Sequence, residues 1–268
     1  MNTFSKYRKT FELGIQNSLE YRTDFLLSLI SVIFPIILQY FLWTAIYSSS
    51  KKIIYGYTYE QMIVYSIMAG MISKLIATGF EYDIYNDIKN GGFSKFIVQP
   101  IGYFEYKISS FLGQKLIQGI IIVSIISVAL IIMNEFSIFN ITITRFLFFL
   151  ITLFLALILN YLIAYSLSAI SFWVGEISYL FQMTSMIVNI VSGGVLPINV
   201  FGNKILSIFK FLPFQYTVYY PVNVIDGVLS NSEIIEGIMF QCIWIVLFFL
   251  ISKVVWKFGS KKYMAIGG

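Results

Sequence analysis

The residues from Phe25 to Tyr47 read FLLSLISVIFPIILQYFLWTAIY, a run of 23 residues without a charged side chain. A helix of about 20 residues is long enough to cross the roughly 30 Å hydrocarbon core of a bilayer. The surface of a soluble protein needs polar and charged side chains at short intervals, and this run has too few of them. The run therefore predicts a membrane-spanning helix, and it decides the fold class of the chain.

Further runs of the same kind predict six membrane helices in total. The other five lie at about Gln61–Phe80, between Lys115 and Glu135, between Arg145 and Glu176, between Glu176 and Lys204, and between Glu236 and Lys253. Composition agrees, because 58% of the 268 residues are hydrophobic and 12% are charged, about half the charged share of an average soluble domain. We expect an all-α integral membrane protein with a single transmembrane domain over residues 1–268.

The N-terminal residues 1–24 are predicted to form an interfacial helix. Apolar side chains from Phe4 to Leu19 recur at steps of three or four, and so share one helical face. Such a helix can lie flat on the inner membrane surface. The alternative is an ordinary cytoplasmic helix that packs on another chain.

Residues 197–236 are predicted to form an extracellular hairpin. Within it, Phe211–Ile225 is uncharged but short, and it contains Pro213 and Pro221. Two prolines in 15 residues favour a re-entrant or interfacial element over a seventh span.

The distribution of Lys and Arg predicts that both termini are cytoplasmic. With that orientation, the inner segments carry Lys6, Arg8, Lys9, Arg22, Lys89, Lys95, Lys107, Lys253, Lys257, Lys261 and Lys262, and the outer segments carry Lys51, Lys52, Arg145, Lys204 and Lys210. Eleven basic residues against five agree with the excess that cytoplasmic loops of membrane proteins carry. The expected location is the cell membrane, with multiple passes and no role in nucleic-acid binding.

Several kinds of chemistry are not expected of this chain. It contains no His, the usual general base and commonest metal ligand, and its one Cys is Cys242. It has no G-x-x-x-x-G-K-[ST] phosphate loop. We therefore expect no catalytic residue, no metal site and no bound cofactor, and any ATP must be bound by another polypeptide.

The segment between the second and third spans, residues 81–106, is the most informative soluble stretch. Ile84 and Ile88 lie one helical turn apart, and Gly91 with Gly92 is expected to stop that helix. Phe93, Phe96 and Ile97 follow as an apolar cluster, and Pro100 ends the stretch. Such a helix suits docking into a groove of a partner protein. A loop that only connects two spans is an equal alternative.

Two longer motifs and a C-terminal one carry a resemblance to a known family. The run NDIKNGGFSKFIVQPIGYFEY resembles the cytoplasmic segment of type-2 ABC exporter permeases, with the pattern on Ile88, Gly91, Phe93, Ile97 and Pro100. The run SGGVLPINVFGNKILSIFKFLPFQYTVYYPVNVIDG is similar to the outer hairpin of the same family, through Gly193, Gly194, Pro197, Pro213, Phe214, Tyr219 and Pro221. The tail from Lys262-Tyr263 to Gly267-Gly268 fits one branch of these permeases. One departure is Gln99, where many members carry Arg near the proline.

The resemblance implies a permease that pairs with a second permease copy or a related permease. Each copy would sit on a cytoplasmic ABC ATPase subunit, which binds ATP and Mg. Ile84, Ile88, Gly91, Phe93, Phe96 and Pro100 would couple the permease to the ATPase, and the residues of the outer hairpin would form an extracellular gate. The chain itself would be a non-catalytic subunit of an exporter.

The transported substance is expected to be amphipathic or hydrophobic, such as a drug, a peptide or a lipid-like molecule. So few charges within the spans predict a pathway lined mostly by apolar and aromatic side chains. Lys74 is the exception, and its side chain either reaches the interface or lines a substrate path. The alternatives are a self-contained channel or secondary transporter and a membrane-embedded enzyme.

Overall fold

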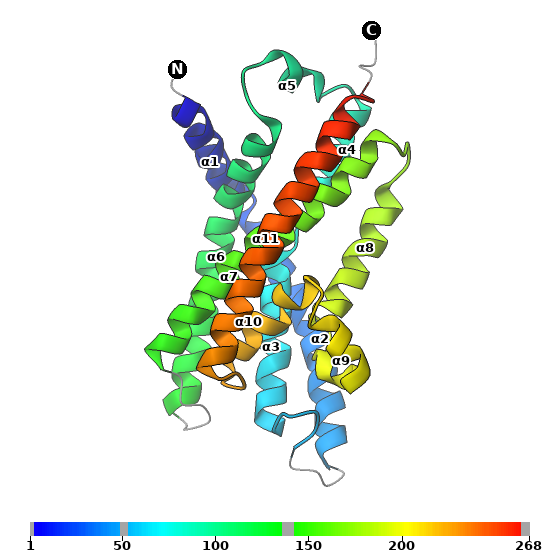
Figure 1. Cartoon of the computed structure of the whole chain (residues 1–268). Helices are drawn as coiled ribbons and strands as arrows, with labels where there is room; N and C mark the ends of the chain where they lie inside the picture. Colours follow the sequence, from blue (N-terminus) through cyan, green and yellow to red (C-terminus); the bar gives the residue numbers. More distant parts are fainter. Residues whose placement is uncertain (1–2, 49–52, 136–141, 264–268) are drawn as a thin grey trace.

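The computed structural model describes residues 3–48, 53–135 and 142–263, and in these ranges the chain is helical with a single isolated β-bridge between Ile54 and Tyr57. The elements are α1 (Thr3–Glu20), α2 (Arg22–Ser48), α3 (Tyr59–Ile76), α4 (Phe80–Lys89), α5 (Ser94–Val98), α6 (Tyr103–Glu135), α7 (Ile143–Ser168), η1 (Ala169–Phe172), α8 (Ser178–Val191), η2 (Ile198–Phe201), α9 (Asn203–Phe209), η3 (Phe214–Tyr216), α10 (Tyr219–Ile225) and α11 (Asn231–Ser260). Figure 1 shows them as one elongated bundle.

Five helical segments of the described chain are long and apolar enough to cross a membrane, so the protein is a multi-pass membrane protein. They are Arg22–Ser48, Tyr59–Lys89, Tyr103–Ile132, Ile143–Phe172 and Asn231–Ser260. These correspond to five of the six predicted spans. The all-helical membrane class is therefore confirmed, while the count of six is not.

The predicted fifth span is the one that differs. Its helix, α8, has 14 residues, a length of about 21 Å that falls short of the hydrocarbon core. The helix ends because Gly193 adopts φ of 84°, a backbone conformation that stops a helix and that favours glycine. The predicted 27-residue run is thus a short helix followed by the tightly folded segment that leads into η2 and α9.

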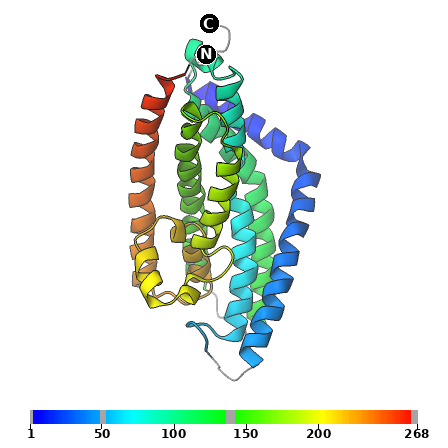
Figure 2. The same cartoon turned by 90° about the vertical axis from the view of Figure 1, so that its right-hand side faces the viewer.

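The chain begins and ends at the same end of the bundle. Figure 1 shows the start of α1 and the end of α11 at one end, together with α5, while α3 and α11 begin toward the other end. In Figure 2, α2 and α11 lie on opposite sides of the bundle, with α3, α7 and α8 between them. Most of the basic residues assigned to the inner side therefore share one end of the molecule. Two residues assigned to the outer side, Lys51 and Lys52, lie outside the described residues.

The N-terminal helix is confirmed as a helix, and it packs closely on α6 of the same chain. A Cβ added to Gly14 would lie 2.3 Å from the Ser110 carbonyl oxygen, and one added to Gly113 would lie 2.2 Å from the Phe11 carbonyl oxygen. Only glycine allows two helix backbones to approach this closely. The crossing holds α1 at an angle to α2, and a single residue, Tyr21, separates the two helices.

The predicted cytoplasmic loop at residues 81–106 is largely helical. α4 begins at Phe80, separated from α3 by Ala77 to Gly79, and α6 begins at Tyr103 instead of near Lys115. Gly91 adopts φ of 79° just after α4, in agreement with the expectation that glycine ends this helix.

Candidate functional site

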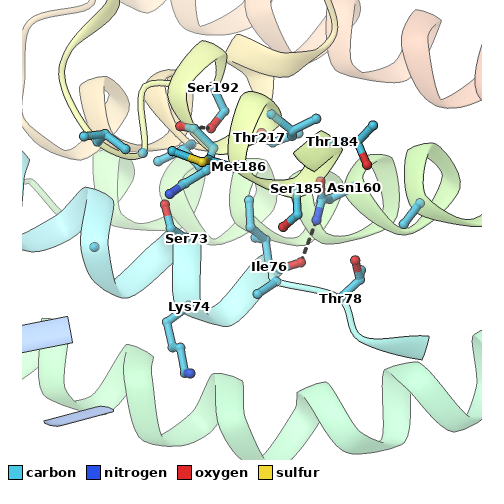
Figure 3. A pocket seen from close by; sticks show the side chains of 18 of the residues that line it. Ser73, Lys74, Ile76, Thr78, Asn160, Thr184, Ser185, Met186, Ser192 and Thr217 are labelled. Atoms are coloured by element: carbon cyan, nitrogen blue, oxygen red, sulfur yellow. Dashed lines mark hydrogen bonds between the residues drawn. The ribbon is translucent and has the colours of Figure 1, made fainter. Parts of the chain in front are cut away.

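A cavity of about 760 Å³ lies between α2, α3, α7 and α8. It is lined by residues from the middle of the candidate spans, such as Pro35 of α2, Gly70 of α3 and Ile163 of α7. Figure 3 shows lining side chains of α3, α7 and α8, such as Ser73, Asn160 and Ser185. This central cavity is therefore a hollow at the level expected for the membrane interior.

Uncharged polar groups are numerous in the lining of the central cavity. Six of them are Ser73, Asn160, Thr184, Ser185, Ser192 and Thr217. Apolar side chains such as Val32 and Ile36 of α2 complete the wall, and Phe181 is the aromatic lining residue. Amides and hydroxyls from α3, α7 and α8 thus share the wall with apolar side chains, and the expectation of a mostly apolar and aromatic pathway stays a prediction.

The charged groups of the central cavity lie near the break between α3 and α4. Lys74 and Glu81 are its charged lining residues. Figure 3 shows the Lys74 side chain pointing away from Asn160 and Ser192, and Lys74 also lines a second cavity. The structure therefore places this residue at an edge shared by two cavities, not in the centre of either wall.

The break between α3 and α4 is held by side chains of two other helices. The Asn160 side-chain amide donates to the Ile76 carbonyl at 2.7 Å, an interaction drawn in Figure 3. The Lys115 ammonium donates to the Ala77 carbonyl, also at 2.7 Å. The last carbonyls of a helix lack partners within the helix, so α6 and α7 supply the missing donors. The sequence signal for Asn160 was a single amide in an otherwise apolar run.

The far end of the central cavity is formed by the segment after α8. Gly194 and Thr217 line it, and the Tyr219 backbone N–H donates to the Ser192 carbonyl at 2.9 Å. The Tyr65 hydroxyl donates to the Gly193 carbonyl at 2.7 Å. These bonds bring Gly193 and Tyr219, two of the residues predicted for the hairpin, together against α3.

Other predicted hairpin residues shape this segment without lining the central cavity. Pro197 directly precedes η2, Pro213 directly precedes η3, and Phe214 begins η3. Pro221 is buried within α10. The Tyr219 hydroxyl donates to the Asn199 side chain at 2.7 Å and closes the hairpin on itself. Pro197 and Pro213 thus lie at helix starts of this segment, and the gate role of these residues stays a prediction.

The predicted ATPase-coupling residues differ in exposure. Three of them are buried in the core of this chain: Ile84 is 0% exposed, Ile88 8% and Phe93 7%. A residue must lie on the surface to contact a partner directly, and these three do not. Ile97 and Val98 of α5 are 61% and 81% exposed, and the coupling role of the segment stays a prediction.

Phe93 is buried because it joins an aromatic cluster of its own chain. Its ring centroid lies 5.0 Å from that of Tyr103, 5.6 Å from Phe172 and 5.1 Å from Tyr263. Phe96 packs on Tyr103 at 4.7 Å. Aromatic pairs at these distances stabilise a core by about 0.5–1.5 kcal/mol each. The predicted tail residue Tyr263 therefore contacts the start of α5, and Gly267 and Gly268 lie outside the described residues.

Sequence reasoning missed a buried carboxyl group in the hairpin. Asp226 follows α10, is 3% exposed, and has no hydrogen-bond partner for either oxygen among the described residues. Burial raises its pKa from 3.8 to about 8. Its position at the end of an apolar run resembled an ordinary solvated turn. Within the described ranges, no group of three or more His, Cys, Asp or Glu side chains is placed to hold a metal ion.

A family model described as ABC-2 family transporter protein matches residues 33–267. The match includes α4, α5, the hairpin and the lining of the central cavity except Ser31 and Val32. No curated protein and no solved structure matches the chain.

Proposed function

We propose, from the premise that this chain belongs to the ABC-2 family of transporter proteins, that its central cavity is the substrate path of an exporter. As a member of that family, the chain is the membrane subunit of an ABC transporter and has an ATPase partner. The proposal adds the direction, outward, and the class of substrate, amphipathic or hydrophobic. ATP and Mg belong to the partner ATPase.

The observation that carries the proposal is the mixed lining of the central cavity. Its volume of about 760 Å³ lies within the range of sites for drug-sized molecules. Hydroxyl and amide groups such as Ser73 and Asn160 alternate with apolar side chains, and the charged residues lie at one edge. An amphipathic molecule finds both kinds of contact there. A small ion usually requires charged groups or rings of carbonyl oxygens instead.

The two ends of the central cavity support a path with a gate and a coupling element. The hairpin held by Gly193, Gly194 and Tyr219 closes one end, and we assign it the role of the outer gate. The segment from α4 to α5 lies beyond the other end, and we assign the exposed side chains of α5 to the contact with the ATPase. Buried Ile84 and Ile88 would transmit that contact to the spans through packing.

The proposed topology has six crossings and both termini in the cytoplasm. The fifth crossing lies between Glu176 and Lys204 and contains the short helix α8. The hairpin that follows is a re-entrant element on the outer side, and α1 is an interfacial helix. Shared placement of the two chain ends in Figure 1 supports an even number of crossings. The excess of Lys and Arg at that end supports its cytoplasmic location. The protein would work as a pair of permeases, identical or related.

A bulky side chain in the central cavity tests the proposal. Ser185→Trp places an indole among the lining residues of α8. Met183→Trp is the matched control, because Met183 is on the same helix, is 65% exposed and does not line the cavity. Each variant is reconstituted with the partner ATPase in inside-out vesicles, and ATP-dependent uptake of a fluorescent amphiphile is measured.

We expect Ser185→Trp to lower uptake at least tenfold, and Met183→Trp to transport like the parent. Both variants should still hydrolyse ATP with the partner, since neither touches α4 or α5. Equal uptake by Ser185→Trp and the parent would show that the substrate passes elsewhere. Uptake that needs no ATP would favour a secondary transporter.

A further inference from the structure

A second cavity, of about 580 Å³, lies between the α1–α2 junction, the α3–α4 break and α6. Its lining is polar and includes Asn17, Lys74, Gln114, Lys115 and Gln118. Lys74, Ala77 and Thr78 line this cavity as well as the central one. We call it the lysine cleft, and nothing in the transport proposal uses it.

Two lysine side chains, Lys74 and Lys115, line the lysine cleft, and neither forms an ion pair within the described ranges. Lys74 makes no hydrogen bond and no ion pair within the described ranges, where the ion pairs are Arg8–Glu12 and Lys107–Asp87. Lys115 donates to the Ala77 carbonyl and, at 3.0 Å, to the Gln118 side chain. Both side chains are half-buried, and the two positive charges repel each other. Half-buried like charges are unfavourable unless an anion lies between them.

No carboxylate of the surroundings forms an ion pair with Lys74 or Lys115 within the described ranges. Glu81 accepts a hydrogen bond from the Thr78 hydroxyl with one oxygen and attracts Lys115 only from beyond ion-pair distance. Asp24 and Asp83 also line the lysine cleft but are exposed, so water screens their charge. The third lysine of the lining, Lys107, is already paired with Asp87 at 2.9 Å.

The position of the lysine cleft indicates where its anion comes from. Tyr21, between the end of α1 and the start of α2, lines the cleft. Phe25 of the same wall is the first residue of that run. This is the level of the lipid head groups, since it separates polar from apolar sequence. Basic pockets between membrane helices at this level bind the phosphates of anionic lipids.

We propose that the lysine cleft binds a phosphate group, with Lys74 and Lys115 as its cationic ligands, and that a phospholipid head group supplies it. Lysine binds phosphate as a compact positive charge with three donors. The side-chain amides of Gln114 and Gln118 line the same wall and are suitable additional donors. The acyl chains would leave the cleft past Phe25 toward the bilayer.

The test uses the purified full chain in detergent and native mass spectrometry of bound lipid. The probes are phosphatidylglycerol, which is anionic, phosphatidylcholine, which is zwitterionic, and inorganic phosphate as a competitor. Lys74→Gln removes one ligand and leaves the α3 end capped by Lys115. Lys253→Gln is the matched control, because Lys253 is exposed near the end of another candidate span. Lys74→Arg keeps the charge.

We expect the parent, Lys74→Arg and Lys253→Gln to retain phosphatidylglycerol in preference to phosphatidylcholine. Lys74→Gln should bind phosphatidylglycerol about tenfold more weakly while its thermal unfolding midpoint stays near that of the parent. Equal affinity of Lys74→Gln and the parent, or equal retention of the two lipids by the parent, would overturn the proposal. Displacement of the lipid by millimolar inorganic phosphate would transfer the site to a soluble phosphate and overturn the lipid assignment.

Discussion

Asp226 has an unusual environment for a carboxyl group. Neither oxygen has a hydrogen-bond partner among the described residues, and the nearby Arg145 guanidinium donates instead to the Val224 and Leu229 carbonyls. Burial without a partner favours the neutral form of an acid, which is why the pKa of Asp226 is raised to about 8. At neutral pH the folded protein therefore holds a proton that the unfolded chain has released.

The stability of the hairpin should fall as pH rises through this range. Between pH 4 and pH 8 the folded state binds more protons than the unfolded state, so the free energy of unfolding decreases with pH and levels off above about 8. From pH 5 to pH 8 the loss is on the order of 4 kcal/mol. Asp226→Asn should remove this dependence, and Glu236→Gln, a change of an exposed acid near the start of α11, should keep it.

Thermal unfolding of the detergent-purified protein at pH 5 to 8.5 measures the effect. The parent and Glu236→Gln should unfold at lower temperature as pH rises, and Asp226→Asn at nearly constant temperature. If Asp226→Asn followed the parent, the pH dependence would belong to another group.

At the scale of single elements, α4 and α5 differ in the exposure of their apolar side chains. Ile97 and Val98 lie on its surface, while Ile84 of α4 is fully buried. We expect Ile97→Ser with Val98→Ser to weaken association with the ATPase at least tenfold, since each lost apolar contact is worth about 1.5–3 kcal/mol. Ile84→Ala should instead lower stability by about 2–5 kcal/mol, because it leaves a core cavity.

Two measurements separate these effects: the affinity of each variant for the ATPase, and its unfolding midpoint. The double serine variant should keep the parent's midpoint and lose affinity. Ile84→Ala should do the reverse. An unchanged affinity of the double serine variant would remove α5 from the contact.

The elements that the sequence predicts well are those set by long uncharged runs. Phe25–Tyr47 became most of α2, and the run before Lys253 became part of α11, because length and hydropathy alone suffice for a long apolar helix. The prediction of a full membrane-spanning helix after Glu176 was wrong for a local reason. A Cβ on Gly194 would lie 2.5 Å from the Ser73 hydroxyl oxygen, so the chain turns against α3 there, and no charge marks that contact in the sequence.

The candidate site was less predictable than the fold for a related reason. Turn-forming residues such as Gly193 and Pro213 were recognisable from their types and order. The central cavity, however, depends on which helices lie side by side, and Asn160 and Ser73 are far apart in the chain. The burial of Phe93 depended in the same way on Tyr263, 170 positions later in the sequence.

The orientation of the whole molecule can be tested at two exposed serines. Ser230 precedes α11 and Ser260 ends it, so the two lie at opposite ends of one candidate span. With Cys242 replaced, a cysteine at position 230 should react with an impermeant thiol reagent in intact cells. A cysteine at position 260 should react only after the membrane is permeabilised.

Equal expression of the two variants is the control for this experiment. Labelling of position 260 and protection of position 230 in intact cells would invert the proposed orientation. The hairpin would then lie inside, and the basic end of the bundle would lie outside.

The hydrogen bonds at the C-terminal end of α3 have a mechanical consequence. The side chains of Asn160 and Lys115, from two different helices, bind the last carbonyls of α3 and so define a hinge between α3 and α4. Rotation at this hinge breaks only these side-chain hydrogen bonds, which are worth about 1 kcal/mol each. Bending a continuous helix would instead break backbone hydrogen bonds within the helix. Ala77 and Thr78, at the hinge, line both cavities. A rotation of α4 about the hinge would therefore change the shape of the central cavity and of the lysine cleft at the same time.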